Sequence, residues 1–469
     1  MYTYDSLLEA ITTTDGETRD IFDPATGELI AAAPVQTAAD VDRAIDTAVA
    51  HQASWAGLSN DERVAYLHKA ADAIEANAEA LVTILSREQG KPLNGPNARF
   101  EVGACATWLR VTADTPLPVE TIIDDGDTFA EMHYRPLGTV GAITPWNWPM
   151  MIAIWQIAPS LRMGNTVVQK PSEYTSLSGL ALNFILNTVL PEGVLNTVVG
   201  AGDLGARIVE SEKIDKIMFT GSTRTGKRIV EASSGNLKRL TLELGGNDAG
   251  IVLDDVDPKA IAEGLFWGAF INTGQTCAAL KRLYVPDSIY DEVVAELAEF
   301  AQKMPMGNGL SEDNVLGPLQ NEMQFNVVDR LVEAAKSSGA RVVLGGNPDR
   351  DAVGYFYPTT LIADIDPGNE LVVEEQFGPA LPIIRYSTVD EAVELANGLD
   401  VGLGGSVWSA DRDRAREVAA RITAGTVWIN SHGNIHPVVP FGGAKQSGYG
   451  QEFGTAGLKS VAQPQVIQG

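Results

Sequence analysis

The feature that most constrains the fold is an alternation of short apolar runs and helical patterns between Gly138 and Asp255. Helical patterns such as SLSGLALNFILNTVL separate runs that are typical of buried strands, namely GTVGAIT, NTVVQK, LNTVV, KIMFTG and AGIVLDD. Parallel strands need a crossover connection, which is usually a helix. The alternation therefore predicts a parallel α/β sheet of the Rossmann-like kind.

Other patterns lie on either side of this region. A capping box at Ser59 to Glu62 (SNDE) predicts the start of a helical stretch that ends near Gly90. The segment PVETIIDDGDTFAEMHYRPLG alternates around an Asp125-Gly126 turn, which predicts a β-hairpin. The tail after residue 448 is a candidate strand beside it, and a second α/β region extends from about residue 246 to 445. The hairpin is either an arm between subunits or an ordinary surface hairpin.

The composition excludes several classes of partner. The chain has 469 residues, enough for two or three domains, and its 34 basic and 61 acidic residues give a net charge of −27. Nucleic acids and anionic membranes require basic patches, so neither is expected as a partner. The acidic balance is either generic or an adaptation to high salt. No apolar run reaches the ~18 residues of a membrane span, and the amino terminus lacks the basic residues of a secretion signal, so a cytoplasmic location is expected.

The cysteines and histidines offer few metal or disulfide sites. Two cysteines, Cys105 and Cys277, cannot form a disulfide framework or a cysteine-rich metal site, and reduced thiols are expected. Cys105 lies in an apolar helical pattern, which indicates a buried residue without a role. His432 and His436 have ligand-like spacing, but their Gly/Pro-containing stretch favours a solvated loop, so no metal is predicted.

A glycine-containing turn, FTGSTRTGK, follows an apolar strand and begins a helix. Gly221, Gly226 and Lys227 nearly match a Walker A loop, but Arg228 stands where Mg²⁺ binding needs Ser or Thr. A phosphate-binding turn at a helix N-terminus and a plain strand-to-helix turn both remain open. Lys227 and Arg228 are expected on a solvated helix face.

Two further stretches contain reactive side chains. LTLELGGN places Glu243 beside two glycines, and INTGQTCAA places Cys277 after a glycine-containing turn. A lone cysteine is often a core residue and a lone glutamate is often solvated. A thiolate nucleophile and a carboxylate base are, however, the groups that a thioester mechanism requires.

Seven motifs occur in one order along the chain: PWNWP, KPSE, FTGST, LELGGN, GQTC, EEQFGP and PFGGAKQSG. Together they resemble the aldehyde dehydrogenase superfamily over essentially the whole chain. The resemblance implies an NAD-binding Rossmann-like domain (1–115 and 137–245), a catalytic α/β domain (246–445) and a β-hairpin oligomerisation module (116–136 and 446–469). It also implies a homodimer or a homotetramer.

The same resemblance assigns three catalytic roles. Cys277 matches the nucleophile that attacks the aldehyde carbon, and Glu243 matches the base that activates water to hydrolyse the thioester. Asn147, with the backbone N–H of Cys277, matches the oxyanion donor, a role worth about 3 kcal/mol. Acylating relatives that pass the thioester to CoA generally lack a glutamate at the position of Glu243. A CoA-acylating enzyme and a catalytically silent binding protein are the alternatives.

The resemblance further implies a dinucleotide site. Lys170 and Glu173 match residues at the adenosine ribose, and Ser222 matches one at the pyrophosphate, while Glu375 and Phe377 match those at the nicotinamide riboside. A carboxylate at Glu173 accepts hydrogen bonds from ribose hydroxyls and repels a 2′-phosphate, so NAD is predicted over NADP. The predicted cofactor-binding residues are Trp146, Lys170, Glu173, Gly221, Ser222, Gly226, Leu244, Glu375 and Phe377.

The predicted substrate is an uncharged aldehyde. By resemblance the tunnel wall comprises apolar side chains, which favour an aliphatic or aromatic aldehyde. In relatives that oxidise succinate semialdehyde, arginines occupy the positions of Trp155 and Ile271, so recognition of a carboxylate is not expected here. A semialdehyde dehydrogenase is the alternative. The predicted wall residues are Met151, Trp155, Phe270, Ile271, Ile435 and Phe441.

Overall fold

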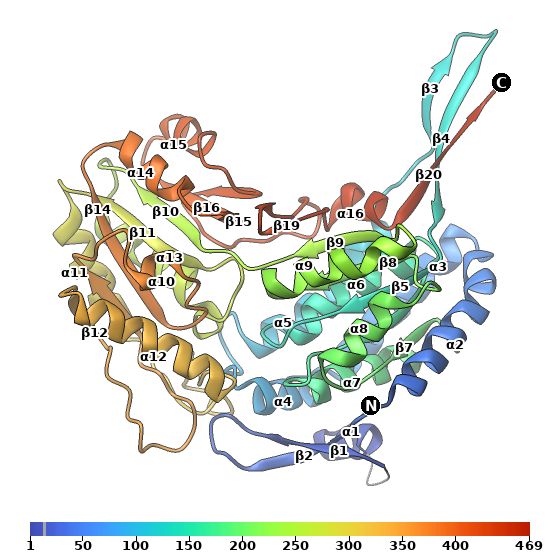
Figure 1. Ribbon diagram of the computed structural model, residues 1–469, viewed down its shortest axis with the longest axis horizontal. Helices are drawn as coiled ribbons and strands as arrows, with labels where there is room; N and C mark the ends of the chain where they lie inside the picture. Colours follow the sequence, from blue (N-terminus) through green and yellow to red (C-terminus); the bar gives the residue numbers. More distant parts are fainter. Residues whose placement is uncertain (13–15) are drawn as a thin grey trace.

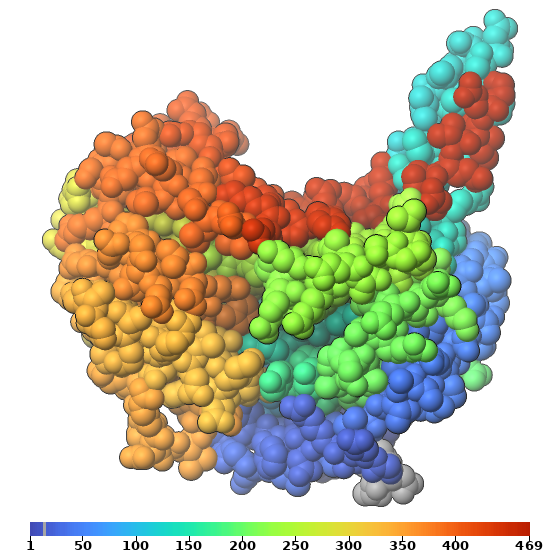
Figure 2. Space-filling view, viewed as in Figure 1, coloured from blue at the N-terminus to red at the C-terminus, as the bar shows by residue number. Residues whose placement is uncertain are grey.

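The computed structural model describes residues 1–12 and 16–469. Two α/β bodies lie side by side, and a narrow arm projects from the amino-terminal body (Figure 1). The space-filling view shows the arm extending well beyond the rest of the surface (Figure 2). None of the helices in the described ranges has the length and apolarity to cross a membrane.

The first body is built on a six-stranded sheet in the order β19-β9-β8-β5-β6-β7. Neighbours from β9 to β7 are parallel, and β19 pairs antiparallel with β9. Every residue of β5, β6 and β8 is buried, as expected for a parallel sheet covered on both faces. The strands are β5 (Thr139–Ile143), β6 (Thr166–Lys170), β7 (Leu195–Thr197), β8 (Lys216–Thr220), β9 (Arg239–Glu243) and β19 (Gly448–Tyr449).

Helices form a separate apolar core on each face of this sheet. Helices α3 to α7 contribute to one core, and α2, α8 and α9 contribute to the other. The helices are α1 (Tyr4–Ile11), α2 (Ala38–Ala56), α3 (Asn60–Ala76), α4 (Ala78–Gln89), α5 (Ala98–Asp114), α6 (Pro149–Arg162), α7 (Ser176–Asn187), α8 (Gly202–Glu210), α9 (Thr223–Ala232) and the short η1 (Ser233–Gly235).

The second body is built on a seven-stranded sheet in the order β12-β13-β14-β11-β10-β16-β17. All neighbours are parallel except the edge pair β12 and β13. Its strands are β10 (Asp248–Val252), β11 (Leu280–Pro286), β12 (Arg341–Leu344), β13 (Thr360–Ala363), β14 (Ala380–Tyr386), β16 (Gly404–Trp408) and β17 (Thr426–Ile429). Its helices are α10 (Pro258–Phe270), η2 (Ile271–Gly274), α11 (Tyr290–Ala301), α12 (Glu322–Ser337), α13 (Glu370–Val373), α14 (Val389–Asn397) and α15 (Arg412–Ala419).

The arm is a three-stranded antiparallel sheet in the order β20-β4-β3. It consists of β3 (Glu120–Asp124), β4 (Phe129–Pro136) and the carboxy-terminal β20 (Ala462–Gln468), which α16 (Gly454–Ser460) precedes. The predicted hairpin and the predicted return of the tail beside it are both confirmed. Two small pairs complete the fold: β1 (Thr18–Phe22) with β2 (Leu29–Pro34), and β15 (Val401–Gly402) with β18 (Ala444–Lys445).

Two details of the sequence analysis are corrected. The capping box at Ser59 is present, but the helical stretch is broken at Asn77, whose Oδ1 accepts a hydrogen bond from the Tyr2 backbone N–H at 2.7 Å. The run AGIVLDD forms β10 of the second sheet, and the first sheet instead ends with β9, which was not predicted as a strand. The alternation therefore predicted parallel strands correctly, but these strands belong to two sheets rather than one.

Candidate active site

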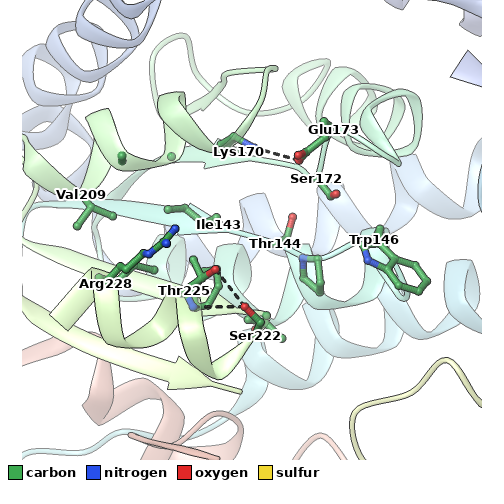
Figure 3. Close-up of a pocket in the computed structure, with 18 of the residues that line it drawn as sticks. Ile143, Thr144, Trp146, Lys170, Ser172, Glu173, Val209, Ser222, Thr225 and Arg228 are labelled. Carbon is green, nitrogen blue, oxygen red and sulfur yellow. Dashed lines mark hydrogen bonds and ion pairs between the residues drawn. The ribbon is translucent and has the colours of Figure 1, made fainter. Parts of the chain in front are cut away.

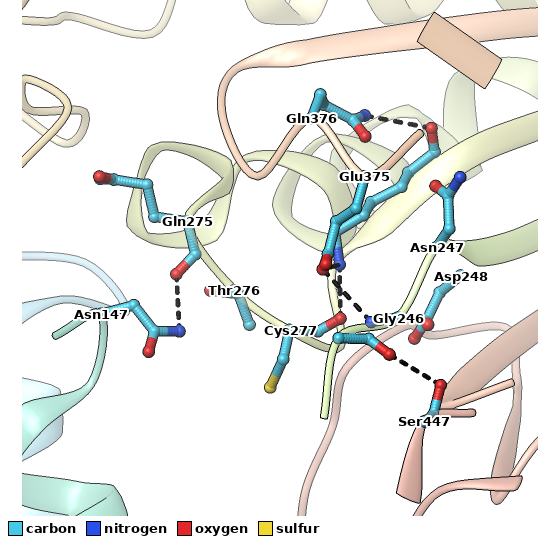
Figure 4. Close-up of polar contacts among 12 residues, drawn as sticks. Asn147, Gly246, Asn247, Asp248, Gln275, Thr276, Cys277, Glu375, Gln376 and Ser447 are labelled. Carbon is cyan, nitrogen blue, oxygen red and sulfur yellow. Dashed lines mark hydrogen bonds and ion pairs between the residues drawn. The ribbon is translucent and has the colours of Figure 1, made fainter. Parts of the chain in front are cut away.

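The two bodies are joined where β9 ends and β10 begins. Glu243 is the last residue of β9 and Asp248 the first of β10, so only residues 244–247 connect the sheets at this point. Ser447 holds this connection: its Oγ donates to the Gly245 carbonyl at 2.8 Å, and its carbonyl accepts from the Leu244 N–H at 3.0 Å (Figure 4). The strand end that carries Glu243 is thereby fixed beside the second body.

Cys277 lies in the second body, on the loop between η2 and β11. Asn272, Thr273 and Gly274 all have positive φ (50°, 56° and 75°), which turns the chain sharply just before the cysteine. A Cβ at Gly274 would lie 2.3 Å from the Gly378 carbonyl oxygen, so this position requires glycine. On the far side of the loop, Lys281 Nζ donates to the Cys277 carbonyl at 2.5 Å.

The environment of Cys277 favours the neutral thiol. Desolvation raises the pKa of Cys277 to about 12, and the Lys281 ammonium lowers it only in part. The carboxylates of Glu243, Glu375 and Asp248 raise this pKa further. The thiol is therefore electrostatically coupled to Glu243 across the gap between the two bodies.

Asn147 comes from the first body and contacts the same loop (Figure 4). Its side-chain Nδ2 donates to the Gln275 carbonyl at 3.0 Å, and its backbone carbonyl accepts from Asn272 Nδ2 at 2.9 Å. A primary amide has two N–H donors, and one of them is used here. The neighbouring Trp148 donates from Nε1 to Thr276 Oγ1 at 2.9 Å, so three hydrogen bonds connect this segment to the residues before Cys277.

A fully buried ion pair lies beneath Asn147. Lys91 Nζ contacts Glu101 Oε2 at 2.5 Å, donates to the Asn147 carbonyl at 2.9 Å, and lies 3.6 Å from the centre of the Trp148 ring. Glu101 Oε1 accepts from the backbone N–H groups of Met150 and Met151 in the first turn of α6. Burial lowers the pKa of Lys91 to about 8, and Glu101 opposes this shift. The pair fixes the start of α6 and the carbonyl of Asn147 together.

Glu243 is buried next to a second carboxyl group. Neither of its side-chain oxygens has a hydrogen-bond partner among the described residues, and the same is true of Glu452. Desolvation, and then the charge of Glu452, raises the pKa of Glu243 well above its usual range. Desolvation also raises the pKa of Glu452 to about 8, while Lys216 opposes it. Both groups are therefore protonated more readily than surface glutamates.

A cavity of about 660 Å³ lies in the first body, at the carboxyl ends of β5, β6 and β8 (Figure 3). Five predicted cofactor-binding residues line it: Trp146, Lys170, Glu173, Gly221 and Ser222. Lys170 Nζ lies 3.9 Å from Glu173 Oε2, and desolvation lowers the pKa of Lys170. Ser222 is the N-cap of α9 and accepts from the Thr225 N–H at 3.3 Å. The open end of this helix thus faces the cavity.

The other four predicted cofactor-binding residues lie outside this lining. Gly226 packs α9 closely on Leu244, because a Cβ there would lie 2.7 Å from a Leu244 methyl group. Glu375 lies near Cys277, where it forms an ion pair with Lys281 at 3.0 Å and accepts from the Gly246 N–H at 3.3 Å. Phe377 contacts Trp146 edge to face at 5.4 Å between ring centres. Phe377 thereby contacts the cavity lining, and Glu375 lies close to the cysteine.

Five of the six predicted wall residues lie in one apolar cluster. Met151, Trp155 and Phe441 are buried in it, and the partly exposed Ile271 and Ile435 pack against it together with Cys277. Phe270 does not join them: it is fully buried in a core of the second body, 5.1 Å from the ring of Phe266. Phe270 and Ile271 therefore contribute to different apolar cores, although they are adjacent in the chain.

One expectation about histidine is corrected. The His432 side chain is buried, with Nδ1 2.8 Å from Ser406 Oγ and Nε2 3.6 Å from Asp248, so it is not in a solvated loop. In the described ranges, no group of three or more His, Cys, Asp or Glu side chains is arranged to hold a metal ion. Lys227 and Arg228 are both exposed, as predicted, and Arg228 also lines the cavity. Cys105 is buried as predicted.

Comparison with known proteins gives a consistent result. A model described as “Aldehyde dehydrogenase family” matches residues 11–467. Aldehyde dehydrogenase 1A1 of Oryctolagus cuniculus is 38% identical over 461 residues, which cover 96% of this chain and 92% of that protein. Phenylacetaldehyde dehydrogenase of Pseudomonas fluorescens is 37% identical over 459 residues, covering 94% and 91%. The structure of betaine aldehyde dehydrogenase from Staphylococcus aureus in complex with NAD+ superposes with a TM-score of 0.92 at 33% identity, covering 98% and 92%.

Proposed function

Because the chain belongs to the aldehyde dehydrogenase family, we propose that it oxidises an uncharged aldehyde to the carboxylic acid, with NAD, through a thioester on Cys277. The observation that carries this proposal is the meeting of three groups from two bodies. Cys277 lies on a loop that Asn147 contacts, and its thiol pKa responds to Glu243. A nucleophile, a neutral hydrogen-bond donor and a base are the parts that acyl transfer requires.

The proposed reaction assigns one task to each group. The Cys277 thiol gives up its proton to water as its sulfur attacks the aldehyde carbon, and the developing oxyanion accepts hydrogen bonds from the free N–H of Asn147 and the backbone N–H of Cys277. A bound nicotinamide supplies the hydride acceptor. Glu243 then takes a proton from water, and the resulting hydroxide attacks the thioester carbon, which releases the acid and the thiol.

The cavity supports NAD as the cofactor. Its volume, the N-terminus of α9 and the Ser222 hydroxyl suit a dinucleotide with a central pyrophosphate. Glu173 on the wall favours ribose hydroxyls and opposes a 2′-phosphate, although Lys170 partly neutralises it. We therefore expect a higher kcat/KM with NAD than with NADP, and the reverse preference would contradict this assignment.

The apolar cluster beside Cys277 supports an aliphatic or aromatic aldehyde. Trp155 and Ile271 occupy the positions at which a carboxylated substrate would need arginine. The relatives include a phenylacetaldehyde dehydrogenase and retinaldehyde dehydrogenases, whose named substrates are uncharged and apolar. Highest activity on succinate semialdehyde in a panel of aldehydes would refute this choice.

The arm supports assembly into a homo-oligomer. It exposes large apolar side chains on or directly before strands that extend beyond the body of the protein: Val119, Ile122, Ile123, Phe129, Val466 and Ile467. Exposed apolar patches of this kind mark interaction surfaces. We propose that the module formed by residues 116–136 and 446–469 binds a second copy of the chain.

The central test replaces Cys277 by alanine and measures NADH formation from an aldehyde panel with NAD, NADP or CoA. We expect activity to fall to background, because no other group forms the thioester. The matched control, Cys105→Ala, removes the other thiol and should retain activity. Turnover in Cys277→Ala would disprove the mechanism, and NADH formation that depends on CoA would favour the acylating alternative.

A further inference from the structure

Arg228 has a position that neither the catalytic proposal nor the predicted cofactor residues use. Three cations, Arg224, Lys227 and Arg228, lie on α9, and among them only Arg228 lines the cavity. Figure 3 shows its side chain reaching from α9 toward Ile143 and Val209, at the end of the cavity opposite Trp146. Within the described ranges this guanidinium forms no hydrogen bond or ion pair, although the chain carries a net charge of −27.

The surroundings of Arg228 form an apolar slot rather than an anion site. Between α8 and α9 the cavity is lined by small and aliphatic side chains, together with glycines of α8, namely Ile143, Ala206, Val209, Ile229, Ala232, Gly202 and Gly205. A carboxylate, Glu210, also lines this end. Such a slot suits a flat, uncharged ring, and the nearby carboxylate opposes a phosphate group.

We propose that Arg228 binds the purine base of the dinucleotide by stacking its guanidinium plane on the ring. The proposal rests on the proposed function, since it takes the cavity to be the NAD site. A planar guanidinium stacks on aromatic faces better than a compact ammonium does, and an arginine without an ion-pair partner keeps its plane available. Ser222 would hold the pyrophosphate at the N-terminus of α9, so Arg228 would act only on the adenosine half.

The experiment measures ligand binding by calorimetry, independently of catalysis. Wild type, Arg228→Ala, Arg228→Lys and the control Lys227→Ala are titrated with NAD, ADP-ribose and nicotinamide mononucleotide. We expect Arg228→Ala to weaken NAD and ADP-ribose about tenfold, equivalent to about 1.4 kcal/mol, and Arg228→Lys to recover only a small part. Lys227→Ala removes the same charge from the adjacent position and should change both dissociation constants less than about twofold.

The outcomes separate this proposal from the one on which it rests. Nicotinamide mononucleotide has no purine, so its binding should be equal in wild type and Arg228→Ala. Unchanged affinity of Arg228→Ala for NAD and ADP-ribose, full recovery by Arg228→Lys, or an equal loss for the mononucleotide would each overturn the stacking role. If wild type bound neither NAD nor ADP-ribose, the NAD site itself would be refuted. Because Arg228 is exposed and unpaired, unchanged thermal midpoints should show that the variants are folded.

Discussion

Replacing the buried pair Lys91–Glu101 tests how the site is held together. Removing one partner of a buried ion pair typically costs about 3–5 kcal/mol. Lys91→Met leaves Glu101 with both helix N–H donors, so we expect the low end, about 3 kcal/mol. Glu101→Leu leaves the Lys91 ammonium without its carboxylate and two N–H groups of α6 without an acceptor, so we expect about 5 kcal/mol or more. The double variant retains only the loss of the two N–H bonds, about 2–3 kcal/mol.

Unfolding in urea, followed by tryptophan fluorescence and circular dichroism, measures these differences. The Trp148 ring lies 3.6 Å from Lys91 Nζ, so its emission should also report the loss of the cation. The two single variants should lower kcat as well. Lys91→Met removes the 2.9 Å hydrogen bond to the Asn147 carbonyl, and Glu101→Leu displaces the lysine that donates it. Equal losses for the two single variants, or a double variant equal to their sum, would refute the reasoning.

Three further predictions concern pH, the thiol and assembly. Burial raises the pKa of Glu452 to about 8, so the folded state retains a proton that the unfolded chain releases near pH 4.5. The free energy of unfolding should therefore fall as pH rises from 5 to 8. Glu452→Gln removes this contribution, so its thermal midpoint should match wild type at pH 5 and exceed it at pH 8, and parallel pH profiles would contradict this. In a Cys105→Ala background, iodoacetamide should alkylate Cys277 more slowly than a free cysteine at pH 7, because burial raises the thiol pKa to about 12. The alkylation rate should rise about tenfold per pH unit up to pH 10. A plateau of the rate near pH 8.5 would be inconsistent with this pKa. Ile122→Glu, at an exposed position of the arm, should lower the mass measured by sedimentation, whereas an unchanged mass would count against the arm as an interface.

The sequence was most informative where local pattern determines structure. Apolar runs separated by helices predicted the parallel strands, and the Asp125-Gly126 turn predicted the hairpin, because both depend on nearby residues. The break at Asn77 could not be predicted in this way, since its partner Tyr2 lies 75 positions earlier in the chain. The apolar runs did not predict β9, because Thr241 and Glu243 alternate there with Leu240 and Leu242.

For the site as well, local motifs predicted the reactive residues, whereas their surroundings depend on distant segments. Motif order located Cys277, Glu243 and Asn147, but the buried surroundings that shift their pKa values come from distant segments such as the one that carries Glu452. The polar pattern of its helix predicted the exposure of Arg228. It could not predict that Arg228 lines the cavity, because the residues of α8 on the other side of the cavity come from a different segment. His432 was misjudged for a similar reason, because Asp248 and Ser406 reach it from other strands.

The short connection between the two bodies has a consequence for how this protein tolerates change. The base and the nucleophile are carried by different bodies of the fold, and residues 244–247 are the segment that connects the strand of Glu243 to the second body. An insertion of one or two residues there should leave each body intact by spectroscopy while separating the water-activating carboxylate from the acyl group. Such a variant would still be acylated but would release product slowly. A stoichiometric burst of NADH followed by a slow steady state would therefore show that the length of residues 244–247 positions the carboxylate for hydrolysis.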